Sequence, residues 1–259
     1  MRNTIAILFK ELRVAFTTPV AYVVFAVFTI VSSFFFLRIL TDFQRSVTVY
    51  TQMRPQALKY LNFTDQVLAP LFYNVAVLLV FAVPFLTMRL VAEERRSRSF
   101  ELLMTCPVRP LHIATGKYLS ALVLIGVMLL LVLIYPLLVS AYAQVGSVAW
   151  STVASGLLGL FLLGAAFAAI GLFVSALTTS QIIAAFITWC LLMLLWVIGW
   201  AANDNVGVTR AVLSGLSAVD HIRGFTRGLI AMQDLVYYLS LIVFGLFMTH
   251  RALESQRWR

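Results

Sequence analysis

The stretch that decides the fold is residues 151–202, STVASGLLGLFLLGAAFAAIGLFVSALTTSQIIAAFITWCLLMLLWVIGWAA. It contains two apolar segments, residues 151–178 and 181–202, which are separated only by a short polar turn around Thr179. Each segment reaches the roughly 20 residues that an α-helix needs to cross the hydrocarbon core of a bilayer. The stretch therefore predicts two transmembrane helices joined as a tight hairpin.

Small residues recur in the first of these segments at four-residue spacing, as at Gly164 and Ala168 or at Gly171 and Ser175. Small side chains let neighbouring helices in a membrane approach closely. We therefore expect the small residues of the fourth span to pack against the fifth span.

The composition of the whole chain is that of a membrane protein. Hydrophobic residues make up 62% of the 259 residues and charged residues 11%, whereas soluble domains are about half apolar and about a quarter charged. Nineteen Lys and Arg against ten Asp and Glu give a net charge of +9. The basic residues lie between the apolar segments, where they meet lipid headgroups, so this charge does not indicate nucleic-acid binding.

Four further apolar segments are long enough to cross a bilayer, which predicts a single all-α integral membrane domain over residues 1–259. The six predicted spans are residues 20–40, 67–90, 118–142, 151–178, 181–202 and 232–250. Of the 19 Lys and Arg, 12 fall on the side that holds both chain termini and the segment between the second and third spans. This bias predicts cytoplasmic termini, with the reverse orientation as the alternative.

The first eighteen residues predict an amphipathic helix at the membrane surface. Apolar side chains recur there at helical spacing, and the basic side chains lie elsewhere around the helix. The apolar positions are Ile5, Leu8, Phe9, Leu12 and Phe16. We interpret this helix either as an anchor on the cytoplasmic leaflet or as a lever that leads into the first span.

Within the predicted spans, charged and histidine side chains lie only near the span ends, as at Arg38, Arg89 and His250. A proton-coupled carrier or a membrane-embedded enzyme would need ionisable or nucleophilic groups at depth. We therefore predict no catalytic residues and no metal site in this chain.

The most informative polar segment is MRLVAEERRSRSFELLMTCPVRPLHIATGK, residues 88–117, between the second and third spans. If it is helical, Glu94 and Arg98 have the i,i+4 spacing of an ion pair, and Phe100 lies beside apolar residues ahead of Pro107. Mixed charges beside a short apolar ridge are typical of a docking surface. A solvated loop that only orients the chain is the alternative.

This segment resembles the loop that contains the coupling helix in permease subunits of the type-2 ABC exporter family. The shared pattern is an acidic pair with basic residues, a Glu-Leu-Leu step, a Thr before Pro, and Gly-Lys at the head of the third span. In this sequence these residues are Glu93, Glu94, Arg95, Arg96, Glu101, Leu102, Leu103, Thr105, Pro107, Gly116 and Lys117. Residues 175–186, SALTTSQIIAAF, are similar to the family's turn between spans four and five.

The resemblance implies the fold of that family. It implies an elbow helix over residues 1–18, a cytoplasmic coupling helix between the second and third spans, and re-entrant helices in the external loop before the sixth span. Residues 203–231 fit a re-entrant pair, because they are too apolar for a free loop and too interrupted by glycine to span. In this loop we interpret Asp220 as a helix cap beside an interfacial His221, and not as half of a metal site.

The resemblance also implies partners in the bacterial cytoplasmic (inner) membrane. Two copies of a separate ABC ATPase would bind ATP and Mg²⁺, and a second permease, identical or related, would complete a dimer. The sequence has no Gly-x-x-x-x-Gly-Lys-Ser/Thr phosphate loop, so we expect no enzyme activity and no cofactor in this chain. The residues expected to dock the ATPase are Glu93, Glu94, Arg95, Arg96, Arg98, Phe100, Glu101, Leu102 and Leu103.

Two functions remain open from the sequence. The first is a permease that moves an unidentified cargo, in the export direction, with ATP hydrolysed by the partner subunit. The second is a non-transporting membrane component of an ATP-driven envelope or surface machine. Residues 220–241, DHIRGFTRGLIAMQDLVYYLSL, keep the second open because they resemble the gliding-motility-associated permeases.

Overall fold

The computed structural model describes residues 2–53, 63–96, 110–142, 149–203 and 207–257. All regular secondary structure within these ranges is helical. Six helices are long and apolar enough to cross a membrane, which confirms the predicted all-helical membrane fold. A helix satisfies its backbone hydrogen bonds internally, as a segment surrounded by lipid must.

The spanning helices are α2 (Pro19–Met53), α3 (Ala69–Thr87, preceded by the π-helical turn η2, Thr64–Leu68), α6 (Pro110–Tyr142), α7 (Trp150–Leu177), α8 (Gln181–Asn203) and α11 (Met232–Arg257). The shorter helices are α1 (Arg2–Thr17), α4 (Ala92–Arg96), α9 (Val208–Leu216) and α10 (Ala218–Thr226). Helices α2, α6 and α11 extend beyond the predicted spans into the more polar sequence beside them.

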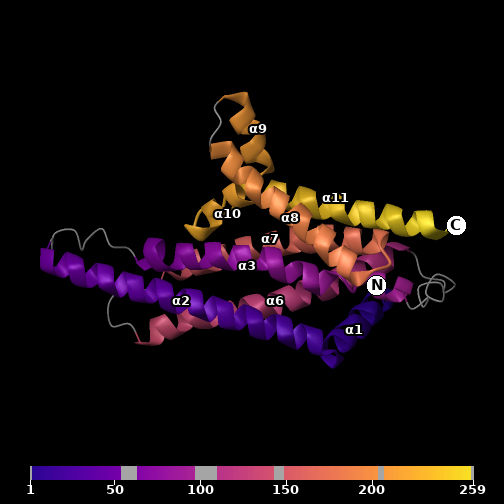
Figure 1. The fold of residues 1–259 in the computed structure, drawn as a ribbon, viewed down its shortest axis with the longest axis horizontal. Helices are drawn as coiled ribbons and strands as arrows, with labels where there is room; N and C mark the ends of the chain where they lie inside the picture. The colour runs from indigo at the N-terminus through magenta and orange to yellow at the C-terminus, as the bar shows by residue number, and fades with distance from the viewer. Residues whose placement is uncertain (1, 54–62, 97–109, 143–148, 204–206, 258–259) are drawn as a thin grey trace.

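Both chain termini lie at the same end of the bundle of long helices, hereafter the terminal end (Figure 1). Helix α1 lies at this end, at an angle to α2, and packs on α6. Helix α9 projects away from the bundle and contacts α8, whereas α10 turns back and contacts α7 (Figure 1). The terminal end therefore gathers α1, α4 and the start of α6.

Helix α7 occupies the centre of the bundle and contacts α3, α6, α8, α10 and α11. Its glycines meet several of these helices: Gly156 faces Phe72, Gly159 faces Phe225, Gly164 faces Ile125 and Gly171 faces Thr87. The expectation that these small residues pack against the fifth span is therefore wrong for the glycines of α7, although α7 and α8 are in contact. A central helix needs close approach on every side, and its glycines serve α3, α6 and α10.

Helices α9 and α10 stand in the segment where a re-entrant pair is expected. Ser217 is the N-cap of α10, because its Oγ accepts a hydrogen bond from the Asp220 N–H at 3.2 Å. Asp220 instead pairs with Arg223 at 3.1 Å, so its interpretation as the cap is wrong. His221 lies with its Nδ1 2.7 Å from Asp234 Oδ1, which fastens α10 to α11.

The apolar stripe predicted along α1 is divided between two surroundings. Leu12 packs against the protein core, together with Ile7 from outside the predicted stripe. Ile5 and Phe9 are exposed, on the part of α1 that would face lipid. The face of α1 that meets the protein also carries Glu11, the acidic residue of this helix.

Candidate functional site

The predicted docking residues fall partly within the described chain. Glu93, Glu94, Arg95 and Arg96 form the last four residues of α4. The other five, Arg98, Phe100, Glu101, Leu102 and Leu103, lie outside the described residues. Helix α4 follows α3 after a turn over residues 88–91, so it begins where the second spanning helix ends.

Lys117 of α6 is the most deeply buried cation among the described residues, with a side chain that is 1% exposed. Its Nζ lies 2.8 Å from Glu11 Oε1 of α1 and 2.9 Å from Glu94 Oε2 of α4. It also donates a hydrogen bond to the carbonyl oxygen of Leu90. A buried ammonium is costly unless it is paired and hydrogen-bonded, and here three oxygens from three parts of the chain meet that need.

Lys10 completes this group with a second positive charge. Its Nζ pairs with Glu94 Oε1 and lies 3.4 Å from Glu11 Oε1. Burial alone would lower the pKa of Lys10, but the hydrogen bond and the negative charge of Glu94, with Glu11, outweigh burial and raise it. The Lys117 cluster, which consists of Lys10, Glu11, Glu94 and Lys117, thus balances two charges of each sign and joins α1, α4 and α6.

Gly116, next to Lys117, is what allows α1 to come this close to α6. A Cβ atom at this position would lie 2.9 Å from the Cβ of Ile7 and 3.0 Å from the carbonyl oxygen of Thr4. Thr4 also contacts His112 of α6, with Oγ1 3.3 Å from Nδ1. The two residues therefore act together: Gly116 allows the close approach of α1, and Lys117 forms an ion pair with Glu11 of α1.

Ser175 of α7 holds the start of α4 from a different helix. Its Oγ accepts hydrogen bonds from the N–H groups of Val91 and Ala92, both at 3.1 Å, and donates to the Met88 carbonyl at 3.0 Å. Helix N-termini leave such N–H groups without a partner inside the helix. Ser175 therefore caps α4 from outside and fixes the turn between α3 and α4 on α7.

Arg95, near the C-terminal end of α4, makes a second contact with α7. Its Nη1 donates a hydrogen bond to the Ala176 carbonyl at 2.9 Å, near the last residue of α7. The final carbonyls of a helix need partners outside the helix, and arginine side chains supply them. Helices α4 and α7 thus cap each other, and these hydrogen bonds hold α4 against the end of α7.

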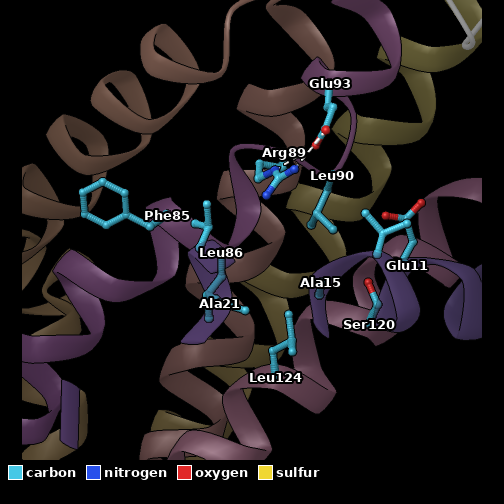
Figure 2. Close-up of a pocket in the computed structure, with 12 residues that line it drawn as sticks. Glu11, Ala15, Ala21, Phe85, Leu86, Arg89, Leu90, Glu93, Ser120 and Leu124 are labelled. Carbon is cyan, nitrogen blue, oxygen red and sulfur yellow. Dashed lines mark hydrogen bonds and ion pairs between the residues drawn. The ribbon is translucent and has the colours of Figure 1, made fainter. Parts of the chain in front are cut away.

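Arg89 and Glu93 form a two-pronged ion pair one helical turn apart. Arg89 Nε lies 2.8 Å from Glu93 Oε2, and Arg89 Nη2 lies 2.9 Å from Glu93 Oε1. Figure 2 shows this pair on one side of a small pocket, with Glu11 and Ser120 on the other side. The acidic pair that the sequence singles out is therefore split between two sites, because Glu93 faces Arg89 and Glu94 faces the Lys117 cluster.

Sequence reasoning missed the partners of Glu94. It predicted an i,i+4 pair with Arg98, which lies outside the described residues, while the structure brings Lys117 and Lys10 to Glu94. The signal that could have found them is the lone acid among the first eighteen residues, Glu11, on an otherwise basic helix. A carboxylate that becomes buried where such a helix meets the protein needs a basic partner there.

Comparison with known proteins gives a family for this architecture. The family described as ABC-2 family transporter protein matches residues 37–249, which includes α3, α6, α7 and α8, the second part of α2 and most of α11. A search of curated proteins found no match. With six spanning helices and this family match over most of its length, the chain belongs to the ABC-2 family and is a transporter permease.

Proposed function

We propose that this permease couples ATP hydrolysis in a separate ABC ATPase subunit to export, and that its terminal end faces the cytoplasm. In this proposal α4 and the residues that follow it, through Leu103, form the docking surface. Two ATPase subunits would act on two permeases, identical or related. The cargo would move along the interface between the permeases.

The observation that carries the proposal is the position of Glu94 in the Lys117 cluster. Glu94 lies on α4, the first part of the proposed docking surface, and its carboxylate binds Lys10 of α1 and Lys117 of α6. Separating buried opposite charges is costly, so a displacement of α4 would move α1 and α6 with it. A surface loop that only orients the chain would need no such attachment.

A second attachment leads from the same helix to the centre of the bundle. Ser175 and the Ala176 carbonyl hold α4 on the end of α7, and α7 contacts five other helices. A packed interior transmits a displacement because it has few voids to absorb it. The ATPase would thus act on α1 and α6 through the ion pairs and on α7 through the hydrogen bonds.

The docking assignment is tested by charge reversal in the proposed surface. We expect Glu101→Arg with Leu102→Asp to abolish stimulation of ATP hydrolysis by the permease and to release the ATPase on purification. The matched control makes the same two kinds of change in exposed residues of α2, Asp42→Arg with Val49→Asp, and should leave both properties intact. A well-folded docking variant that still stimulates ATP hydrolysis normally would overturn the assignment.

The resemblance of residues 220–241 to gliding-motility-associated permeases keeps a second candidate open, a non-transporting component of a surface machine. The two functions differ in whether a compound leaves the cell. The two functions are separated by deleting the gene for this protein and comparing, by mass spectrometry, the lipids and small molecules that the deletion strain and the parent strain export. Loss of one exported compound supports the permease, whereas an unchanged profile with lost surface movement supports the machine.

A further inference from the structure

We propose that the groove between α2 and α3 binds one phospholipid with an ethanolamine headgroup. One of its two acyl chains would lie in the groove, and its ammonium group would enter the small pocket that α1 helps to line. The proposal does not depend on the partner ATPase or on the direction of transport. It follows from the shape and the charge of two adjoining cavities.

The groove is apolar, has a volume of about 440 Å³ and lies on the side of the bundle. Eleven residues line it, all of them apolar, and they come from α2 and α3 alone. They include Val20, Val23, Val27 and Val31 of α2 and Phe81 and Phe85 of α3. Val23 and Val27 are more than half exposed, so the groove opens to the side, where lipid would lie.

The length of the groove matches one leaflet of a bilayer. Its lining on α2 runs from Pro19 to Val31. At a rise of about 1.5 Å per residue this corresponds to roughly 18 Å. Half of a hydrocarbon core about 30 Å thick is roughly 15 Å. An acyl chain that starts at the terminal end would therefore fill the groove over the depth of its own leaflet.

At the terminal end the groove adjoins the pocket of Figure 2. Val20 and Phe85 line both cavities, so the groove continues into the pocket. The pocket also has Glu11, Arg89 and Glu93 in its wall, with Glu93 paired to Arg89 and Glu11 paired to Lys117 behind the wall. Figure 2 shows Phe85 pointing away from these charged groups. The two cavities together offer an apolar run with a charged end, which is the pattern of an amphiphile.

The charges select a headgroup that carries both signs. The pair with Glu93 uses two of the five N–H donors of Arg89, which leaves donors for a phosphate. A carboxylate offers about four acceptor positions, so Glu93 has room for an ammonium N–H as well. A headgroup with only a phosphate could use the remaining donors of Arg89, but it would bring no N–H donor for the open acceptor positions of Glu93.

The size of the pocket selects among zwitterionic headgroups. Its volume of about 50 Å³ is enough for a few water-sized groups and therefore for a primary ammonium. A trimethylammonium group is bulkier and has no N–H to donate to Glu93 or Glu11. The site should therefore prefer phosphatidylethanolamine over phosphatidylcholine.

A second apolar groove shows what the charged end adds. It lies on α11, has a volume of about 570 Å³, and is lined by Val236, Leu239, Ser240, Val243, Phe244 and Phe247. No charged side chain is among these residues. This groove would hold acyl chains without regard to their headgroup, and it provides an internal control.

The test measures which lipid stays bound to the full chain. The purified protein is incubated with vesicles of phosphatidylethanolamine, phosphatidylcholine and phosphatidylglycerol in equal amounts, repurified, and analysed for bound lipid by mass spectrometry. We expect about tenfold more phosphatidylethanolamine than either other lipid, the effect of about one charge-assisted hydrogen bond. Equal retention of the three lipids, or a preference for phosphatidylglycerol, would overturn the proposal.

Two variants locate the site. Val27→Trp fills the groove and should remove the retained phosphatidylethanolamine, whereas Val243→Trp, the same change in the groove on α11, should not. The double variant Arg89→Gln with Glu93→Gln leaves the groove open and the net charge unchanged, and should abolish the preference among headgroups. Retention of that preference in the double variant would contradict the assignment even if Val27→Trp does not fold.

Discussion

Lys117 Nζ and Glu94 Oε2 lie 2.9 Å apart, although Lys117 belongs to the third spanning helix and Glu94 to the short helix after the second. The Lys117 side chain is almost fully buried, and α1 supplies the other carboxylate that it contacts. A buried ion pair is weak evidence for net stability, because apolar residues of similar volume often serve as well. Its value here lies in fixing how three helices sit relative to one another.

Removal of the central cation should be strongly destabilising. Lys117→Met leaves Glu11 and Glu94 with Lys10 as the remaining cation of the cluster, and the loss of one partner of a buried pair costs about 3–5 kcal/mol. Denaturant unfolding in detergent measures this loss. The control is Arg38→Met, since Arg38 is 62% exposed beside Asp42 and its change should cost less than about 1 kcal/mol. Equal shifts in the two variants would contradict the role assigned to Lys117.

Gly171 and Gly126 should respond to the same substitution with opposite signs. A Cβ atom at Gly171 would lie 2.2 Å from Thr87 Oγ1, so Gly171→Ala should overpack the contact between α7 and α3 and cost about 1–3 kcal/mol. At Gly126 of α6 a Cβ atom meets open space, and Gly126→Ala should stabilise the helix by about 0.5–1 kcal/mol. Thermal unfolding of both variants checks the pair, and a stabilising Gly171→Ala would refute the close packing of these helices.

Ser175→Ala should loosen α4 without unfolding α7. The change removes the acceptor of the Val91 and Ala92 N–H groups, and each buried donor left without a partner costs about 1–3 kcal/mol. Hydrogen exchange should therefore become faster at these two amides. The matched control is Ser46→Ala, because Ser46 is bonded to the Asp42 carbonyl of its own helix. Unchanged exchange at Val91 and Ala92 would show that Ser175 is not their cap.

The fold could be predicted largely from the sequence, because a membrane span is a one-dimensional signal. Each of the six spans is long and apolar enough to be recognised without knowing its neighbours. The neighbours themselves could not be predicted. The glycines of α7 predict close helix packing, but their spacing does not show which helix packs against each glycine. Gly171, for example, lies against Thr87 of α3.

The candidate site was predictable in position but not in its contacts. The charged segment after the second span pointed to Glu93 and Glu94, and an i,i+4 spacing identifies local pairs such as Arg89 in the turn with Glu93 in α4. Contacts between helices have no such spacing. Glu11 and Lys117 are far apart in the chain, and they meet because Gly116 lets α1 lie directly on α6.

In the proposed function, Glu94 passes the action of an ATPase to the spanning helices. The most direct test is Glu94→Gln, which keeps the shape of the side chain and removes its charge, in the complex with the ATPase. We expect a complex of normal composition whose ATP hydrolysis is stimulated about tenfold less, while the exposed control Glu254→Gln behaves like the unmodified chain. Full stimulation by Glu94→Gln in an intact complex would show that Glu94 does not couple the ATPase to the spanning helices.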